Sequence, residues 1–297
     1  MSQRPPLDRH ALGQALSRLA NARPGEPGPS IGPDDWHAKR LGLTGAPGAG
    51  KSTLAGQLAL HRAHDRRIAV LAVDPSSPRS GGAILGDRIR MDELPGISEL
   101  FIRSIGSRST TDGLSDNLPE MLDLMDWHRF DEVLLETVGV GQAEYAVRQQ
   151  VDTLVLVLLP ESGDIVQAMK AGIMELADIY VINKADLPGA QKMATDIQRI
   201  AALTQRPSDA WRPPVLLTSS SRPASIAALS DEVDRHQRWL ADGRRQTDVR
   251  RDRVRYRLRR LLERRVADAV RRLDGPVLDG PFHQLFAETL KVLSAAG

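Results

Sequence analysis

Cysteine is absent from this chain of 297 residues. Without cysteine, the chain cannot form disulfide bonds, bind metals through thiolates or use a cysteine nucleophile. No apolar run is long enough to span a membrane, and the first residues lack the apolar core of a secretory signal. We therefore expect a cytoplasmic protein with no membrane partner.

Aromatic residues and net charge are also low, at 4% of the chain and +2 at neutral pH. So small a net charge gives no reason to expect a nucleic-acid partner. Hydrophobic residues make up 41% of the chain and charged residues 26%, which is ordinary for a folded protein. The length suits one large α/β domain with helical additions, or two modest domains.

The most informative segment that is present is the glycine-rich run at residues 45–52, which reads GAPGAGKS. This is the complete pattern of a phosphate-binding loop, in which glycines let backbone N–H groups approach a triphosphate closely. Lys51 is expected to reach the β and γ phosphates, and the Ser52 hydroxyl to ligate Mg²⁺. An apolar strand predicted at 40–44 and a helix predicted at 52–60 give the loop the context that it requires.

A second motif, Asn-Lys-Ala-Asp at residues 183–186, predicts a guanine site. The Asp186 carboxylate can accept hydrogen bonds from N1–H and the 2-amino group of guanine, whereas adenine offers an unprotonated N1 there. Asn183 is expected to contact the imidazole side of the base, and the stem of Lys184 to cover its face. The apolar run at 177–182 predicts a strand that places this motif at the carboxyl edge of a sheet. The two motifs together predict a GTP-binding protein.

The chain is expected to have three parts. Residues 1–38 form a helical N-terminal arm, and residues 39–230 form a GTPase domain of the P-loop NTPase class. Helical stretches in that domain alternate with apolar runs at 40–44, 68–73, 133–135, 153–159, 177–182 and 215–217. This alternation predicts an α/β fold with a mostly parallel central sheet flanked by helices. Residues 231–297 form a C-terminal helical region.

The C-terminal region contains thirteen arginines and four acidic residues between positions 244 and 272. Apolar residues recur through it at helical spacing, which predicts a long amphipathic helix. This helix has an apolar stripe to bury.

Carboxylates stand at the ends of two predicted strands. Asp74 follows the run 68–73, and Glu136 follows the run 133–135, each before a loop rich in glycine. Such positions can hold Mg²⁺ or an attacking water, and Gly139 can donate its N–H to a γ-phosphate. Each carboxylate can also be a helix cap or a solvated turn.

Four segments between about residues 41 and 186 resemble the MeaB/ArgK/MMAA family of GTPases, which are chaperones of adenosylcobalamin-dependent methylmalonyl-CoA mutase. They read GAPGAGKSTL, DPSSPRSGGAILGDRIRM, ETVGVGQAE and ESGDIVQAMKAGIMELADIYVINKAD. The resemblance implies hydrolysis of GTP to GDP and phosphate with Mg²⁺ as cofactor. It also implies a homodimer, joined through a C-terminal helical dimerisation region at residues 231–297, that gates cobalamin loading and protects a B12-dependent acyl-CoA mutase. Burial of the apolar stripe in that dimer and burial against the chain's own GTPase domain explain the pattern equally well.

The motifs and the resemblance together assign roles to individual residues. Those expected to bind the nucleotide are Gly45, Ala46, Pro47, Gly48, Ala49, Gly50, Lys51, Ser52, Thr53, Gly139, Asn183, Lys184, Asp186, Ser219 and Ser220. Those that the resemblance places around Mg²⁺ are Ser52, Asp74, Asp87 and Glu136. Lys51, Asp74 and Gln142 are expected to act in catalysis, with Asp74 or Gln142 positioning water. Asp164 and Lys170 are expected to transmit the nucleotide state to the mutase.

Two loops depart from the family's usual pattern. Residues 105–117 replace a short glycine-rich loop, and residues 218–221 read Thr-Ser-Ser-Ser where Ser-Ala is commoner. The first departure leaves the partner open, so that a mutase acting on isobutyryl-CoA or 2-hydroxyisobutyryl-CoA is also an option.

Two other functions stay open at this point. A metal-insertion maturation GTPase would need soft or imidazole ligands, for which His61 and His64 are the only close histidine pair. A transport-linked or nucleic-acid-binding nucleotide switch would use the arginine-rich segment as a basic tail, but the regular apolar stripe in that segment argues against a free tail.

Overall fold

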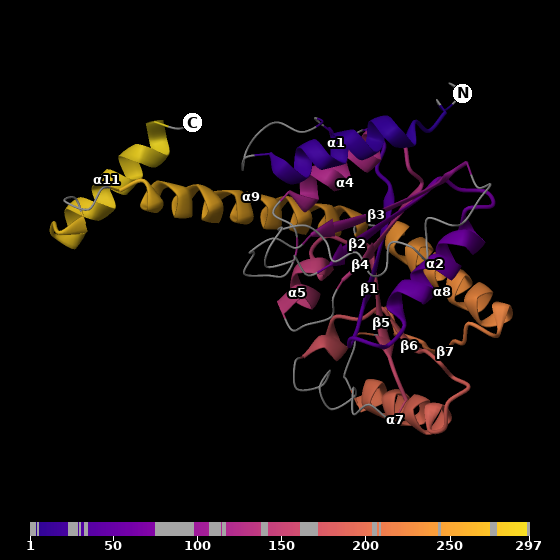
Figure 1. The fold of residues 1–297 in the computed structure, drawn as a ribbon. Helices are drawn as coiled ribbons and strands as arrows, with labels where there is room; N and C mark the ends of the chain where they lie inside the picture. The colour runs from indigo at the N-terminus through magenta and orange to yellow at the C-terminus, as the bar shows by residue number, and fades with distance from the viewer. Residues whose placement is uncertain are drawn as a thin grey trace.

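A sheet of seven strands lies at the centre of the computed structural model (Figure 1). Its order is β3-β2-β4-β1-β5-β6-β7, and every pair of neighbouring strands in the described residues is parallel. The strands are β1 Lys39–Thr44, β2 Ile68–Asp74, β3 Leu100–Gly106, β4 Glu132–Glu136, β5 Thr153–Leu158, β6 Ile179–Ile182 and β7 Val215–Leu217. The predicted P-loop class of α/β fold is therefore confirmed.

The structure describes residues 4, 6–22, 29, 31–32, 35–74, 98–106, 114, 117–137, 142–160, 172–203, 207, 209–242, 245–273 and 278–295. The predicted strands at 40–44, 68–73, 133–135, 153–159, 177–182 and 215–217 all correspond to strands of the sheet.

Helices cover both faces of the sheet because side chains alternate between the faces along each strand. On one face lie α1 Arg9–Asn21, α4 Leu118–Trp127, α5 Gln142–Arg148, the short η2 Ile173–Glu175 and α7 Ala190–Leu203. On the other face lie α2 Lys51–Arg62 and α8 Pro223–Ala241. In β5, Leu154 faces the first group of helices and Val155 faces the second.

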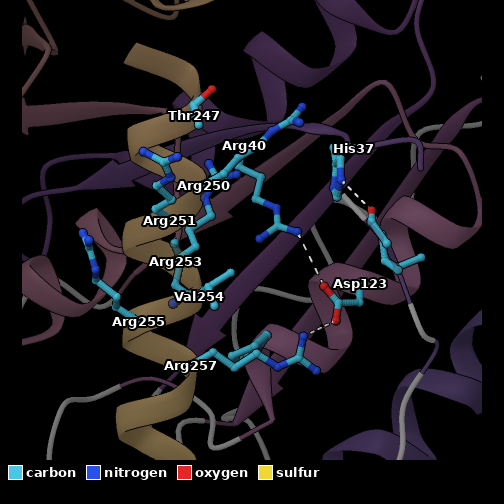
Figure 2. A pocket seen from close by; sticks show the side chains of 14 residues that line it. His37, Arg40, Asp123, Thr247, Arg250, Arg251, Arg253, Val254, Arg255 and Arg257 are labelled. Carbon is cyan, nitrogen blue, oxygen red and sulfur yellow. Dashed lines mark hydrogen bonds and ion pairs between the residues drawn. The ribbon is translucent and has the colours of Figure 1, made fainter. Parts of the chain in front are cut away.

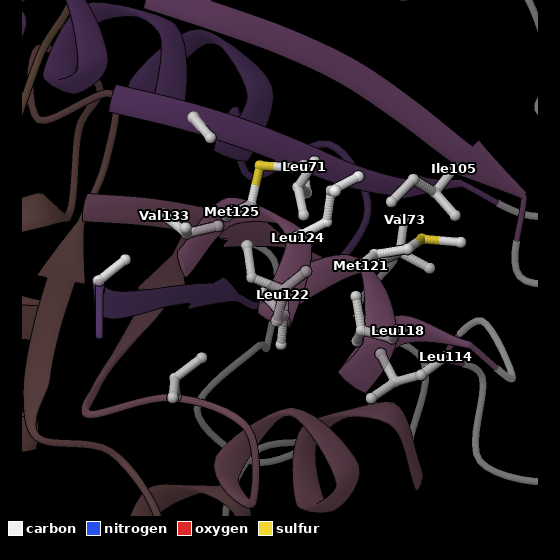
Figure 3. Close-up of a cluster of buried hydrophobic side chains, with 14 of the residues drawn as sticks. Leu71, Val73, Ile105, Leu114, Leu118, Met121, Leu122, Leu124, Met125 and Val133 are labelled. Atoms are coloured by element: carbon white, nitrogen blue, oxygen red, sulfur yellow. The ribbon is translucent and has the colours of Figure 1, made fainter. Parts of the chain in front are cut away.

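β3 and α4 were not identified from the sequence. β3 is the edge strand of the sheet, and Arg103 and Ser104 in it are only half-buried, so its sequence lacks the continuous apolar run of the central strands. α4 is short but amphipathic, and it buries Leu118, Met121, Leu122 and Met125 against the sheet (Figure 3). These four residues lie on one face because positions three and four apart coincide on an α-helix.

α8 passes without a break through residue 230, where the sequence predicted a domain boundary. Its buried residues Ile226, Leu229 and Val233 belong to the same apolar cluster as α2. Arg62 of α2 also ties α8 to the sheet, because its guanidinium donates to Glu132 at 2.6 Å and to Asp234 at 2.7 Å.

α9, at Arg245–Arg271, projects from the sheet domain, and α11, at Phe282–Ala295, contacts it near its far end (Figure 1). The predicted long helix at 244–272 is thus present. Its 27 residues span about 40 Å. Large apolar side chains are exposed every fourth residue along it: Val254, Leu258, Leu262, Val266 and Val270. None of the helices in the described ranges has the length and apolarity to cross a membrane.

Candidate nucleotide site

The two predicted nucleotide motifs lie at the same edge of the sheet. The phosphate loop joins the carboxyl end of β1 to α2, and the guanine motif follows the carboxyl end of β6. Parallel strands bring their carboxyl ends together, and this edge is where nucleotides bind in such folds. Asp74 and Glu136 end β2 and β4 at the same edge.

Gly45 and Gly50 of the phosphate loop lie so close to neighbouring residues that there is no room for a side chain at either position. Gly45 has a φ of 142°, and a Cβ there would lie 2.0 Å from the carbonyl oxygen of Val157 in β5. Gly50 has a φ of 83°, and a Cβ there would lie 2.6 Å from the Asn183 side-chain nitrogen. Both positions therefore exclude any side chain, for reasons of packing in addition to phosphate approach.

Lys51 is the first residue of α2 and is buried. Its ammonium donates to the loop carbonyls of Gly45 at 2.8 Å and Ala46 at 3.0 Å. The N-terminus of α2 lies at the same place, and its backbone N–H groups and helix dipole favour an anion. Pro47 and Gly48 are exposed at the tip of the loop.

Two oxygen groups suited to Mg²⁺ meet beside the loop. The Ser52 hydroxyl donates a hydrogen bond of 2.6 Å to the Glu136 carboxylate, which is 7% exposed at the end of β4. Hydroxyl and carboxylate oxygens are the ligands that Mg²⁺ prefers, so the two residues fit this ion. Within the described ranges, no three His, Asp or Glu side chains are grouped so that they alone could hold a metal.

Asn183 ties the guanine motif to the phosphate loop. Its amide nitrogen donates to the Ala49 carbonyl at 2.8 Å, and its amide oxygen accepts from the Thr218 hydroxyl at 3.0 Å. Lys184 adds a second link, because its ammonium donates to the Gly48 carbonyl at 3.1 Å. The side chain that is expected to read the base is therefore held in register with the loop that is expected to hold the phosphates.

Asp186 is exposed, and its carboxylate accepts a hydrogen bond of 2.6 Å from the Ser219 hydroxyl. This hydrogen bond lowers the pKa of Asp186 below its ordinary value of 3.8. The side chain is thus a carboxylate at neutral pH, the form that can accept from guanine. Ser219 is buried beside it, whereas Ser220 is exposed and its carbonyl accepts from Gln57.

Some predicted site residues cannot be placed in this geometry. Asp87, Gly139, Asp164 and Lys170 lie outside the described residues. Asp74 ends β2 and Gln142 begins α5, but their side chains are also outside the description. Thr53 lies on the exposed side of α2, one residue after Ser52.

Thr218 and Thr137 are two site residues that the sequence analysis missed. Thr218 orients Asn183, and the Thr137 hydroxyl donates to the Thr44 hydroxyl at 3.1 Å, joining the ends of β4 and β1. All three threonines are buried. The signal in the sequence was a hydroxyl residue directly after an apolar strand. A buried hydroxyl without a hydrogen-bond partner destabilises the fold, so such a residue is expected to pair with a neighbouring polar group.

Comparison with known proteins gives matches that span these motifs. A family model described as methylmalonyl Co-A mutase-associated GTPase MeaB matches residues 30–274. A probable GTPase of Mycobacterium tuberculosis is 41% identical over 256 residues, covering 82% of this chain and 75% of that protein. The mitochondrial methylmalonic aciduria type A homolog of Mus musculus is 40% identical over 211 residues, covering 69% of this chain and 50% of that protein. The crystal structure of a LAO/AO transport system kinase is similar with a TM-score of 0.70 and 27% identity, covering 97% of this chain and 88% of that one.

Proposed function

Because the chain belongs to the family of methylmalonyl-CoA mutase-associated GTPases, we propose that it is a Mg²⁺-dependent GTPase that acts as a chaperone of a B12-dependent acyl-CoA mutase. In this role, its GTP cycle gates loading of the cobalamin cofactor and protects the mutase. The hydrogen bond of 2.8 Å between Asn183 and the Ala49 carbonyl carries the nucleotide part of the proposal. It couples base recognition to the phosphate loop within one rigid network.

The described residues suggest how the chain would handle GTP. The backbone N–H groups of the loop and the N-terminus of α2 bind the phosphates, and Lys51 stabilises the negative charge that develops on them. Asp186 and Asn183 hold the guanine, which fixes the γ-phosphate for in-line attack by water. Ser52 and Glu136 would hold Mg²⁺, which neutralises phosphate charge when bound. We assign the positioning of water to Asp74 or Gln142, and nucleotide sensing to Gly139, Asp87, Asp164 and Lys170.

The chaperone role is tested by GTP hydrolysis measured with and without candidate mutases. We expect a change of several-fold with one of the mutases that act on methylmalonyl-CoA, isobutyryl-CoA or 2-hydroxyisobutyryl-CoA, because partner binding completes the active site. A rate that none of the three changes would remove the chaperone role. It would leave the nucleotide site intact, which binding of GTP against ATP tests separately.

We also propose that α9 and α11 join two copies of the chain into a homodimer. The five exposed apolar residues of α9 form one stripe, and α11 exposes Phe282, Phe286 and Leu290, also four residues apart. Exposed apolar stripes of this kind mark surfaces that another protein covers.

Sedimentation velocity can test the dimer with the double variant Leu258→Lys/Leu262→Lys. We expect the wild type to sediment as a dimer and the variant as a monomer, because two buried cations would oppose association. The control Arg251→Lys/Arg255→Lys keeps the charge on the same helix and should remain a dimer. A monomeric wild type would rule the proposal out.

The three-part division at 1–38, 39–230 and 231–297 stays a proposal, together with residence in the cytoplasm. Limited proteolysis tests the division, because a unit that folds alone is released as a stable fragment. α8 crosses residue 230, so we expect a resistant fragment to extend to the end of α8 at Ala241.

A further inference from the structure

A cavity lies at the opposite end of β1 from the phosphate loop. It has a volume of about 740 Å³ and is bordered by Arg40, the second residue of β1, and by the first turns of α9 (Figure 2). Figure 2 shows α9 on one side of the cavity and Asp123 of α4 on the other, with the Arg40 side chain extending toward Asp123. The cavity is therefore separate from the nucleotide site.

The lining of this cavity is strongly basic. Six arginines line it, and Asp123 is the one carboxylate among its described lining residues. Three of the arginines are held by acidic partners: Arg40 by Asp126 at 2.8 Å, Arg253 by Asp152 at 2.6 Å and Arg257 by Asp123 at 2.5 Å. These pairs hold the three guanidinium groups in place.

Carboxylates compensate little of the positive charge of the other three arginines. Arg251 and Arg255 are exposed, and each pairs with a solvated carboxylate three residues earlier on α9, an arrangement that contributes weakly. Within the part of the chain that the structure describes, no carboxylate pairs with Arg250. The cavity thus carries an excess of positive charge.

Buried donors without acceptors also line the cavity. The Nε atoms of Arg40 and Arg253 and the amide nitrogen of Gln150 are buried and have no hydrogen-bond partner among the described residues. Arg40 is 7% exposed and Gln150 is 2% exposed. Burial lowers the pKa of Arg253 to about 10, although the Asp152 carboxylate acts in the opposite direction. The oxygens of a bound anion would supply the missing acceptors and the missing negative charge.

We propose that this cavity binds an organic phosphate with at least two negative charges, such as a nucleoside diphosphate or a coenzyme A derivative. The planar guanidinium group of an arginine can donate two parallel hydrogen bonds to two oxygens of one phosphate. The volume exceeds the space that a single phosphate ion fills and lies within the usual range for small-molecule sites. Ile31 and Pro119 add apolar surface for the organic part of the ligand.

Isothermal titration calorimetry tests this site on the full chain loaded with one equivalent of GDP, so that the guanine site is filled. The probes are pyrophosphate, ADP and coenzyme A. We expect one site per chain, with ADP or coenzyme A bound more tightly than pyrophosphate, and the tighter of the two identifies the source of the phosphate. We also expect the affinity to fall as salt is added.

Two double variants supply the matched control. Arg250→Ala/Arg251→Ala removes two cations at the cavity and should weaken binding at least tenfold. Arg271→Ala/Arg272→Ala removes two cations at the far end of α9, outside the cavity, and should change the affinity less than twofold. Affinity for GDP should be equal in both variants, which shows that the fold is intact. The proposal is overturned by no heat with any probe, by equal loss in both variants, or by pyrophosphate binding most tightly.

Discussion

The two ends of strand β1 are surrounded by different kinds of chemical groups. At its carboxyl end, glycines, hydroxyl groups and backbone carbonyls surround Lys51 and Ser52. At its amino end, Arg40 pairs with Asp126 at 2.8 Å, and on the other face of the sheet Arg62 pairs with Glu132 at 2.6 Å. The carboxyl edge thus presents groups that can exchange their present partners for a ligand. The amino edge uses charged groups mainly to hold helices onto the sheet.

At the amino edge, Arg62 and Glu132 form a buried ion pair. Burial raises the pKa of Glu132, and the charge and hydrogen bonds of Arg62 act against that rise. A buried carboxylate of this kind is tolerated because its partner remains in place, since an isolated buried charge is strongly destabilising. Substitution of Lys51 at one edge should therefore remove activity and leave the fold intact, whereas substitution of Arg62 at the other edge should reduce stability.

The largest effect is expected from Lys51→Ala. Because Lys51 is the one cationic side chain of the phosphate loop, its loss should lower the rate of GTP hydrolysis by about 10³-fold, or about 4 kcal/mol in the activation free energy. Single-turnover hydrolysis measures this rate. The melting temperature should change little, and Lys39→Ala, at the exposed amino end of the same strand, should keep full activity. An active Lys51→Ala protein would contradict the proposed site.

Arg62→Met tests the amino edge. The variant leaves Glu132 buried without its closest cation, so the free energy of unfolding should fall by about 3–5 kcal/mol. Urea denaturation measures this loss, and the affinity for GDP of the protein that remains folded should be unchanged. The double variant Arg62→Met/Glu132→Gln removes the orphaned charge and should recover part of the stability. A single variant as stable as the wild type would show that the pair is not needed.

Asp186→Asn should lower the affinity for GTP by about 10²-fold, because an amide replaces the carboxylate that accepts two hydrogen bonds from guanine. The Asn amide can donate to the 2-oxo group of xanthine, so affinity for xanthosine triphosphate should rise. Competition with a fluorescent guanine nucleotide measures both. Retained preference for GTP over the xanthine nucleotide would show that Asp186 does not read the base.

The smallest effect is expected from His236, a buried histidine of α8. Its Nδ1 lies 2.8 Å from the Thr153 hydroxyl, and burial lowers its pKa below the ordinary value of 6.5, although Asp178 opposes this shift. Since the unfolded chain takes up the proton more readily, this contribution to stability is present above pH 6.5 and is lost as pH falls toward the lower pKa of the folded state.

Melting temperatures between pH 7.5 and 5.5 test this dependence. The wild type should lose stability across this range by about 1 kcal/mol, and His236→Gln should lose less, because its side chain cannot take up a proton. The control His283→Gln changes an exposed histidine and should keep the slope of the wild type. Equal slopes in all three proteins would contradict the role of His236.

Local patterns in the sequence were sufficient for the phosphate loop, the guanine motif, six of the seven strands and the long helix α9. Each depends on residues that are adjacent in the chain or repeat at a short period, so a single segment carries the whole signal. β3 and α4 lacked that signal, because an edge strand is only partly buried and a short helix gives few repeats.

Sequence alone predicted a guanine nucleotide as the ligand of this protein, since the glycines and lysine of the phosphate loop and the aspartate of the guanine motif stand in short contiguous segments. Only the tertiary structure decided which distant groups meet. Asn183 reaches Ala49 across 134 residues, and Arg62 reaches Glu132 across 70. Partners so far apart leave no periodic trace in the chain. They pair because folding of the sheet buries both polar groups, and a buried polar group needs a hydrogen-bond partner.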